Sequence, residues 1–127
     1  MCKNFFVIAL LVFAIIFVGE QNKVSAADYY VGTYESGLRA YVMTETLHFY
    51  GNYRWCTVRV KATDDRQIVY VDYSFDGAAG RRETFKNSQG YSGIVEDGTV
   101  EGNIYGYALK VWGDWVLGKG TSGATFD

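Results

Sequence analysis

The residue types that most often carry catalysis are scarce in this chain. His48 is the only histidine, so several histidine ligands cannot build a metal site and a nucleophile–histidine pair would have one candidate base. Its neighbours Leu47, Phe49 and Tyr50 suggest the end of a strand that runs into a turn. We therefore expect His48 to be an ordinary, partly exposed side chain.

Cysteine usage indicates packing rather than reactivity. Of the two cysteines, Cys2 precedes an apolar N-terminal run and is expected to leave with it, so Cys56 has no internal disulfide partner. Cys56 alternates with Val58 and Val60, and alternate residues of a strand share one face. Because a buried free cysteine behaves as a small hydrophobe, we expect Cys56 to lie in the core.

The acidic residues form no recognisable metal or acid–base motif. They gather near turns, at Asp64-Asp65, at Asp72 and Asp76, and at Glu96-Asp97. None of these groups has the alternating spacing of a calcium-binding loop. The sequence also lacks the glycine-rich phosphate loops and the nucleophile elbow of hydrolases. We therefore predict a non-catalytic protein without a cofactor or a bound metal.

Aromatic residues are the most distinctive part of the composition. The chain has 11 tyrosines and 3 tryptophans, all of which follow the apolar N-terminal run. In alternating strands, Tyr53 and Trp55 would lie opposite the Cys56 face, and Tyr70 would lie opposite Val69. Exposed rings give large contact areas at low entropy cost. Tyr53, Trp55 and Tyr70 are therefore the candidate binding surface, and the alternative is that these rings form a second core layer.

Short strands must position these residues. Turn-forming pairs recur at close intervals, among them Ser36-Gly37, Gly51-Asn52, Asp76-Gly77 and Asp97-Gly98. The intervening segments are rich in Tyr, Val, Thr and Phe, and they leave no room for the helical crossovers of a parallel sheet. We predict an antiparallel meander of six strands, at Asp28–Glu35, Leu38–Leu47, Tyr53–Ala62, Gln67–Asp76, Gly80–Ser88 and Tyr91–Glu96.

One face of this sheet needs a cover, and the C-terminal sequence supplies a candidate. Apolar residues recur at helical spacing, at Ile104, Ala108, Val111, Trp112 and Trp115. Thr99 can cap a helix, and Glu101 suits its first turn. Two glycines, Gly102 and Gly106, argue the other way because each costs about 1 kcal/mol relative to Ala inside a helix. We predict a helix over about Val100–Trp112.

The expected fold class is mainly β, of the α+β type, with a six-stranded antiparallel meander and a C-terminal helix packed on one face. A seventh strand near Ile104–Tyr107 in place of the helix is one alternative, and an all-β barrel or sandwich is another. Residues 27–117 are expected to form a single β-rich domain. Residues 118–127 have the composition of a flexible tail.

Residues 1–26 have the organisation of a cleavable export signal. Lys3 supplies positive charge, residues 5–18 form an apolar run of 14, and Val24-Ser25-Ala26 offers small residues for cleavage. A membrane anchor is the competing interpretation, but a spanning helix needs about 20 apolar residues. We expect cleavage after Ala26 or Ala27, export to the periplasm, cell surface or exterior, and no membrane span in the mature protein.

The charge balance bears on the partner. Without Lys3, Lys23 and Glu20, the totals of 12 basic and 14 acidic residues fall to 10 and 13. Nucleic acid binding requires a basic face, which a net negative domain with scattered charges does not supply. We therefore expect a protein or glycan partner and no nucleic acid.

Three segments of the chain resemble a known family. They are Tyr41-Val-Met-Thr-Glu-Thr-Leu47, Val58-Arg-Val-Lys61 and Glu96-Asp-Gly-Thr-Val-Glu-Gly-Asn-Ile104. Their order is similar to that of small exported bacterial proteins related to surface-adhesin protein E, with Asp97-Gly98-Thr99 at the turn that opens the family's C-terminal helix. The resemblance implies a sheet with a helix on one face and a role in adhesion or at the envelope. The chain lacks the family's proline at that turn and its cysteine pair, so no binding residue is carried over.

Two functions fit these observations. The first is an exported bacterial binding module without catalysis, which contacts a protein or glycan at the cell envelope or surface through an aromatic sheet face. The second is a small inhibitor or immunity-type protein that blocks a secreted enzyme with a loop such as Asp76–Arg82. A small hydrolase ranks last, because the single His48 leaves little from which to build an active site.

Overall fold

The computed structural model describes residues 28–78, 80–119 and 123–127. The predicted export signal lies outside these residues, as do Ala79 of the Asp76–Arg82 loop and residues 120–122 of the predicted tail. The elements in chain order are β1 (Asp28–Thr33), β2 (Arg39–Phe49), β3 (Cys56–Thr63), β4 (Ile68–Asp76), β5 (Thr84–Asn87), β6 (Ser92–Ile94), α1 (Val100–Val116) and β7 (Thr125–Phe126).

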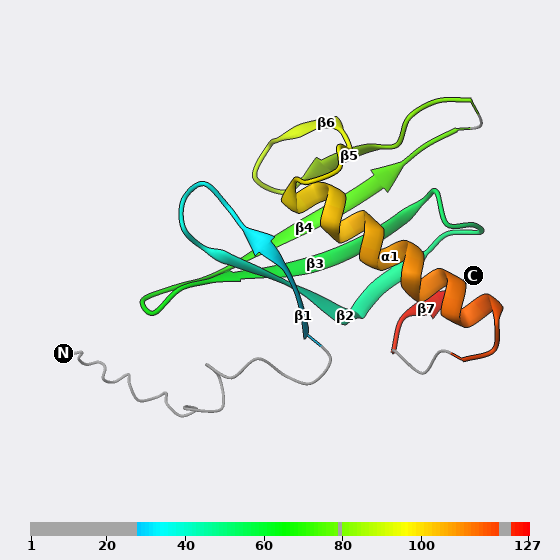
Figure 1. Ribbon diagram of the computed structural model, residues 1–127, viewed down its shortest axis with the longest axis horizontal. Coiled ribbons are helices and arrows are strands. Elements are labelled where there is room, and N and C mark those ends of the chain that lie inside the picture. The colour runs from blue at the N-terminus through cyan, green and yellow to red at the C-terminus, as the bar shows by residue number, and fades with distance from the viewer. Residues whose placement is uncertain (1–27, 79, 120–122) are drawn as a thin grey trace.

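Strands β1 to β6 form the predicted meander. Each strand pairs antiparallel with the next, in the order β1-β2-β3-β4-β5-β6. The sheet curls into a half-barrel, and α1 crosses one face of it from the side of β6 toward β7 (Figure 1). The mainly β fold with a C-terminal helix on one face is therefore confirmed, and the alternative of a strand at Ile104–Tyr107 is wrong because that segment lies inside α1.

The helix forms although it contains glycines, and the packing requires one of these glycines. The Thr99 hydroxyl caps the helix by accepting a hydrogen bond of 2.9 Å from the Gly102 amide. A Cβ atom at Gly102 would collide with the carbonyl oxygen of Glu96. Close approach of the Glu96 backbone thus requires glycine at position 102. The helix continues to Val116, four residues beyond the predicted end.

The core lies between the curled sheet and α1. In β3, the alternating residues Cys56, Val58, Val60 and Ala62 are all buried, as their spacing predicted. Helix residues fill the other side of the core, namely Ile104, Tyr105, Ala108 and Val111. Burial of Cys56, which is 1% exposed, confirms its expected place in the core.

The C-terminus adds a strand that the sequence did not predict. β2 pairs with β1 along Arg39–Met43, and its far end at His48 and Phe49 pairs in parallel with β7. The Phe126 ring stacks on Phe49 with centroids 5.1 Å apart and on Trp115 at 4.4 Å. Part of the segment expected to be a flexible tail is therefore packed against the sheet and the helix.

Two strand starts also differ from the prediction by more than one residue. β3 begins at Cys56 rather than Tyr53, so Tyr53 and Trp55 lie in the loop that joins β2 to β3. β5 begins at Thr84 rather than Gly80, because the preceding residues form a turn in which the Arg81 amide donates to the Ala78 carbonyl. Within the described residues, no helix is both long and apolar enough to cross a membrane.

Candidate functional site

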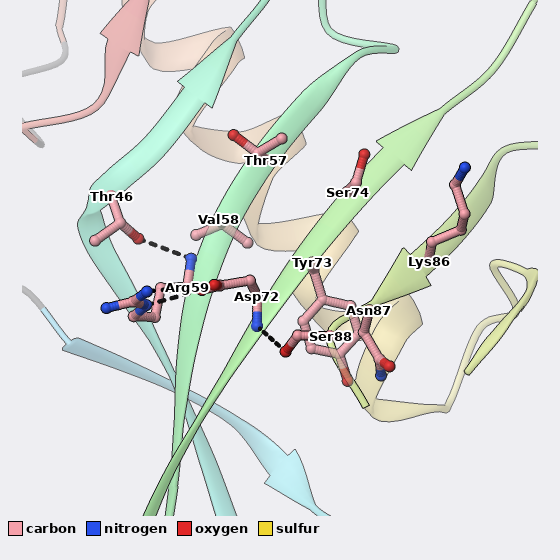
Figure 2. A pocket seen from close by; sticks show the side chains of 10 residues that line it. All are labelled: Thr46, Thr57, Val58, Arg59, Asp72, Tyr73, Ser74, Lys86, Asn87 and Ser88. Carbon is pink, nitrogen blue, oxygen red and sulfur yellow. Dashed lines mark hydrogen bonds and ion pairs between the residues drawn. The ribbon is translucent and has the colours of Figure 1, made fainter. Parts of the chain in front are cut away.

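The sheet face that points away from α1 carries the candidate site. Here β3 presents Thr57 and Arg59, and β4 presents Asp72 and Ser74, because these residues alternate with buried ones. The surface is hollowed into a shallow depression of about 610 Å³ (Figure 2). The depression is lined by Thr46, Thr57, Val58, Arg59, Asp72, Tyr73, Ser74, Lys86, Asn87 and Ser88.

A cross-strand ion pair forms the centre of the depression. Arg59 and Asp72 are direct neighbours in the β3–β4 register, and the guanidinium donates two hydrogen bonds to the carboxylate, of 2.8 and 3.2 Å. The Arg59 guanidinium also lies 5.7 Å from the centre of the Tyr70 ring. Its hydrogen bonds hold the pKa of the Asp72 carboxyl below the ordinary value. Both side chains therefore stay charged and oriented near neutral pH, although about half of each is exposed.

An irregularity in β2 shapes one wall of the depression. The β2–β3 register shifts between Met43, which pairs with Arg59, and His48, which pairs with Thr57. The Thr46 hydroxyl accepts a hydrogen bond of 2.8 Å from that amide and donates one of 2.6 Å to the Met43 carbonyl. One side chain thus hydrogen-bonds to the backbone of both strands at the bulge.

The opposite wall uses a hydroxyl in the same way. Ser88 follows β5, and its amide donates to the Asp72 carbonyl while its hydroxyl accepts from the Asp72 amide, both at 2.9 Å. With Thr46 and Ser88 engaged by the backbone, the floor between them retains polar side chains for a ligand. Among the side chains drawn in Figure 2, those of Ser74 and Lys86 make no hydrogen bond or ion pair with each other or with the rest of the lining.

The three aromatic residues predicted as a binding surface do not come together. Trp55 is 46% exposed at one end of the open face, where its indole N–H donates to the Asp76 carboxylate at 2.6 Å. Tyr70 lies opposite Lys61 of β3, which is six residues after Trp55 in the chain, a span of roughly 20 Å at the rise of a strand. Tyr53 lies beside the helix, with the centroid of its ring 6.2 Å from that of Trp112 on α1.

Tyr50 is a further exposed ring of this face that the sequence analysis did not select. It lies beside His48, with ring centroids 4.2 Å apart, and its hydroxyl is 3.4 Å from the Thr57 hydroxyl. Simple alternation along β2 assigns His48 and Tyr50 to the wrong face of the sheet, because the bulge shifts which residues alternate inward and outward. Recognising the bulge at Thr46 would have been needed to find Tyr50.

His48 is engaged and Cys56 is buried. The His48 ring is 3.0 Å from the Asp127 carboxylate, and 27% of its side chain is exposed, which matches the expectation of an ordinary partly exposed histidine. Burial, with a contribution from nearby Glu83, raises the pKa of the Cys56 thiol to about 12. Among the described residues, no three His, Cys, Asp or Glu side chains lie close enough to hold a metal ion.

Comparisons with protein-family models, with curated proteins and with solved structures give no match to this chain.

Proposed function

We propose that this protein is an exported, non-catalytic bacterial module that binds a glycan at the cell envelope or surface through its open sheet face. Export rests on the N-terminal sequence, with its charged start, apolar run and small residues at the cleavage point. The observation that carries the binding role is the depression around Arg59 and Asp72, whose side chains are oriented by strand pairing rather than by a mobile loop.

The chemistry of the depression favours a glycan over a protein partner. A protein interface has an apolar centre and a polar rim, whereas this face has a polar centre and aromatic residues at its ends. A fixed guanidinium–carboxylate pair, the Ser74 hydroxyl and the Lys86 ammonium group can exchange hydrogen bonds with sugar hydroxyls. Trp55 and Tyr70 offer ring faces on which a sugar ring can pack.

Binding to an array of bacterial cell-wall and host oligosaccharides tests this proposal. The wild-type protein should be retained by a restricted set of glycans. Trp55→Ala and Arg59→Ala should each weaken that binding by about tenfold or more, as expected for anchor residues. Because both side chains are about half exposed, the thermal midpoint should change little.

Trp115→Ala is the matched control, since Trp115 has a similar exposure of 44% but lies on α1. It should leave glycan binding intact at temperatures where the variant is folded. Retention on no glycan, together with stoichiometric capture of an envelope protein, would replace the glycan with a protein partner. A loss of stability in Trp55→Ala would instead place Trp55 among the structural residues and contradict its role in binding.

A further inference from the structure

A second hollow lies on the helix side of the sheet, beyond the N-terminal end of α1. Its volume of about 800 Å³ falls in the range of small-molecule pockets. The walls come from the β1–β2 loop, the β5–β6 turn and the first turn of α1, and the floor comes from the inner face of β3 and β4. Because α1 begins beside β6 and runs toward β7, it leaves this end of the sheet uncovered (Figure 1).

The floor and one wall of this hollow are apolar. Ala62, Val69 and Val71 form the floor, and Leu38 lines the wall made by the β1–β2 loop. Tyr91, which is 70% exposed, stands at the rim. A ligand here would bury an apolar body against the valines, because transfer of apolar surface from water is favourable.

A chain of hydrogen bonds orients the polar groups. The Tyr73 hydroxyl donates to Glu101 Oε2 at 2.8 Å and lies 2.7 Å from the Tyr34 hydroxyl. Since Tyr73 has a single proton to donate, Tyr34 must donate to Tyr73. Burial raises the pKa of both phenols, so both remain neutral. Within this chain of hydrogen bonds, the atoms left to face a ligand, the Tyr34 oxygen and Glu101 Oε1, are therefore acceptors.

The charged residues that line the hollow favour a ligand with a positive charge. Its charged residues are Glu35 and Glu101, and the residues that line it include no Lys, Arg or His. Helix N-termini favour anions, but here the Thr99 hydroxyl accepts from the Gly102 amide and Glu101 already places a carboxylate in the first turn. An anion would thus meet two carboxylates and no cationic side chain, whereas a cation would meet carboxylates and tyrosine side chains.

We propose that this hollow is a binding site for a small organic amine. The ammonium group would contact Glu101 and the Tyr34 oxygen, and the apolar body would lie on Val69 and Val71. Tyr73 and Asn87 line both this hollow and the glycan depression, but the groups assigned to the amine, Glu101, Tyr34, Val69 and Val71, line only the hollow.

Calorimetric titration of the full-length protein at pH 7 with hexylamine, 1-hexanol and hexanoate separates charge from apolar burial. We expect hexylammonium to bind, hexanol to bind about fivefold more weakly, and hexanoate to give no binding heat. The fivefold factor corresponds to roughly 1 kcal/mol for one partly exposed ion pair. Hexanoate binding as strong as that of hexylammonium would overturn the proposal, and so would the absence of binding by all three.

Glu101→Gln removes the charge and keeps an acceptor for Tyr73. It should weaken hexylammonium binding about fivefold and leave hexanol binding unchanged. Asp114→Asn is the matched control, because Asp114 is a carboxylate of the same helix that pairs with Lys110 outside the hollow. Equal effects of the two substitutions would contradict the assignment. If Glu101→Gln does not fold, Tyr34→Phe, which removes the outer acceptor, should still weaken the amine selectively.

Nuclear magnetic resonance distinguishes this site from the glycan face. Hexylamine should shift the methyl signals of Val69 and Val71 and leave the amides of Thr57 and Ser74 in place. The opposite pattern would move the amine to the open face and refute the proposal for the hollow, without bearing on glycan binding.

Discussion

Gly102 lies so close to the carbonyl oxygen of Glu96 that a side chain at this position would collide with the backbone. Gly106, one turn further along the same helix, has open space where its Cβ would be. The two glycines therefore have opposite roles in α1, although they are equivalent by helix propensity.

Gly102→Ala should destabilise the protein, and Gly106→Ala should stabilise it. The second change gains about 1 kcal/mol of helix propensity without a steric cost. The first gains the same propensity but forces the Glu96 backbone or the helix to shift, and the net loss should be about 1–3 kcal/mol. Urea denaturation of both variants measures the difference. Stabilisation by Gly102→Ala would show that the segment before α1 is not held against the helix.

Phe126→Ala should lower the free energy of unfolding by about 1–2 kcal/mol. A fully buried phenylalanine costs roughly 3–5 kcal/mol when truncated, and Phe126 is partly buried, so the smaller figure applies. Thr125→Ala, at the exposed neighbouring position, should change the free energy by less than about 0.5 kcal/mol. If both variants match the wild type in urea denaturation, the C-terminus does not pack on Phe49 and Trp115.

Glu83 should make the protein less stable as the pH rises from about 4.5 to about 7. Burial raises the pKa of this carboxyl to about 7, and its Oε2 atom is buried without a hydrogen-bond partner among the described residues. Between its unfolded and folded pKa values, the folded state holds a proton that the unfolded state has released. The contribution of the protonated Glu83 carboxyl to the free energy of unfolding is therefore fully present below the unfolded pKa. It is lost as the pH rises through the folded pKa.

Glu83→Gln should remove this pH dependence and should be more stable than the wild type at pH 8, by about 1 kcal/mol once solvent screening is considered. Thermal midpoints between pH 4 and 8 provide the measurement. The exposed substitution Glu45→Gln is the control and should keep the wild-type slope. A Glu83→Gln variant with that same slope would show that Glu83 ionises normally in the folded protein.

Cys56 should be protected from thiol reagents. In a Cys2→Ser background at pH 8, labelling of the folded protein should be at least about a hundredfold slower than in denaturant, because the thiolate is the reactive form and burial suppresses it. Absorbance from a disulfide-exchange reagent follows the reaction. Rapid labelling would mean that Cys56 faces outward and that the β3 register is shifted by one residue.

Local sequence patterns were sufficient for the elements that repeat regularly. The alternation of Cys56, Val58 and Val60 predicted the buried face of β3, and the spacing of Ile104, Ala108 and Val111 predicted the face of α1. Both patterns succeed because each residue's burial follows from the geometry of its own element.

The candidate site was only partly predictable. Trp55 and Tyr70 are exposed as expected, but the Arg59–Asp72 pair was not selected, because it depends on the β3–β4 register. Tyr50 was missed because the β2 bulge shifts the alternation of the strand. The hollow proposed to bind an amine was missed because Tyr34 and Tyr73 are 39 residues apart, and no local pattern connects them.

The sequence by itself determined the meander, the capped C-terminal helix and the face of β3 that enters the core, since these follow from period, turn residues and capping. The tertiary structure alone decided three further features. Tyr53 packs beside Trp112, β7 joins the far end of β2, and Gly102 is required by the Glu96 carbonyl. Each of these depends on which distant or oppositely placed groups meet when the sheet curls around the helix, and such contacts leave no periodic trace in the chain.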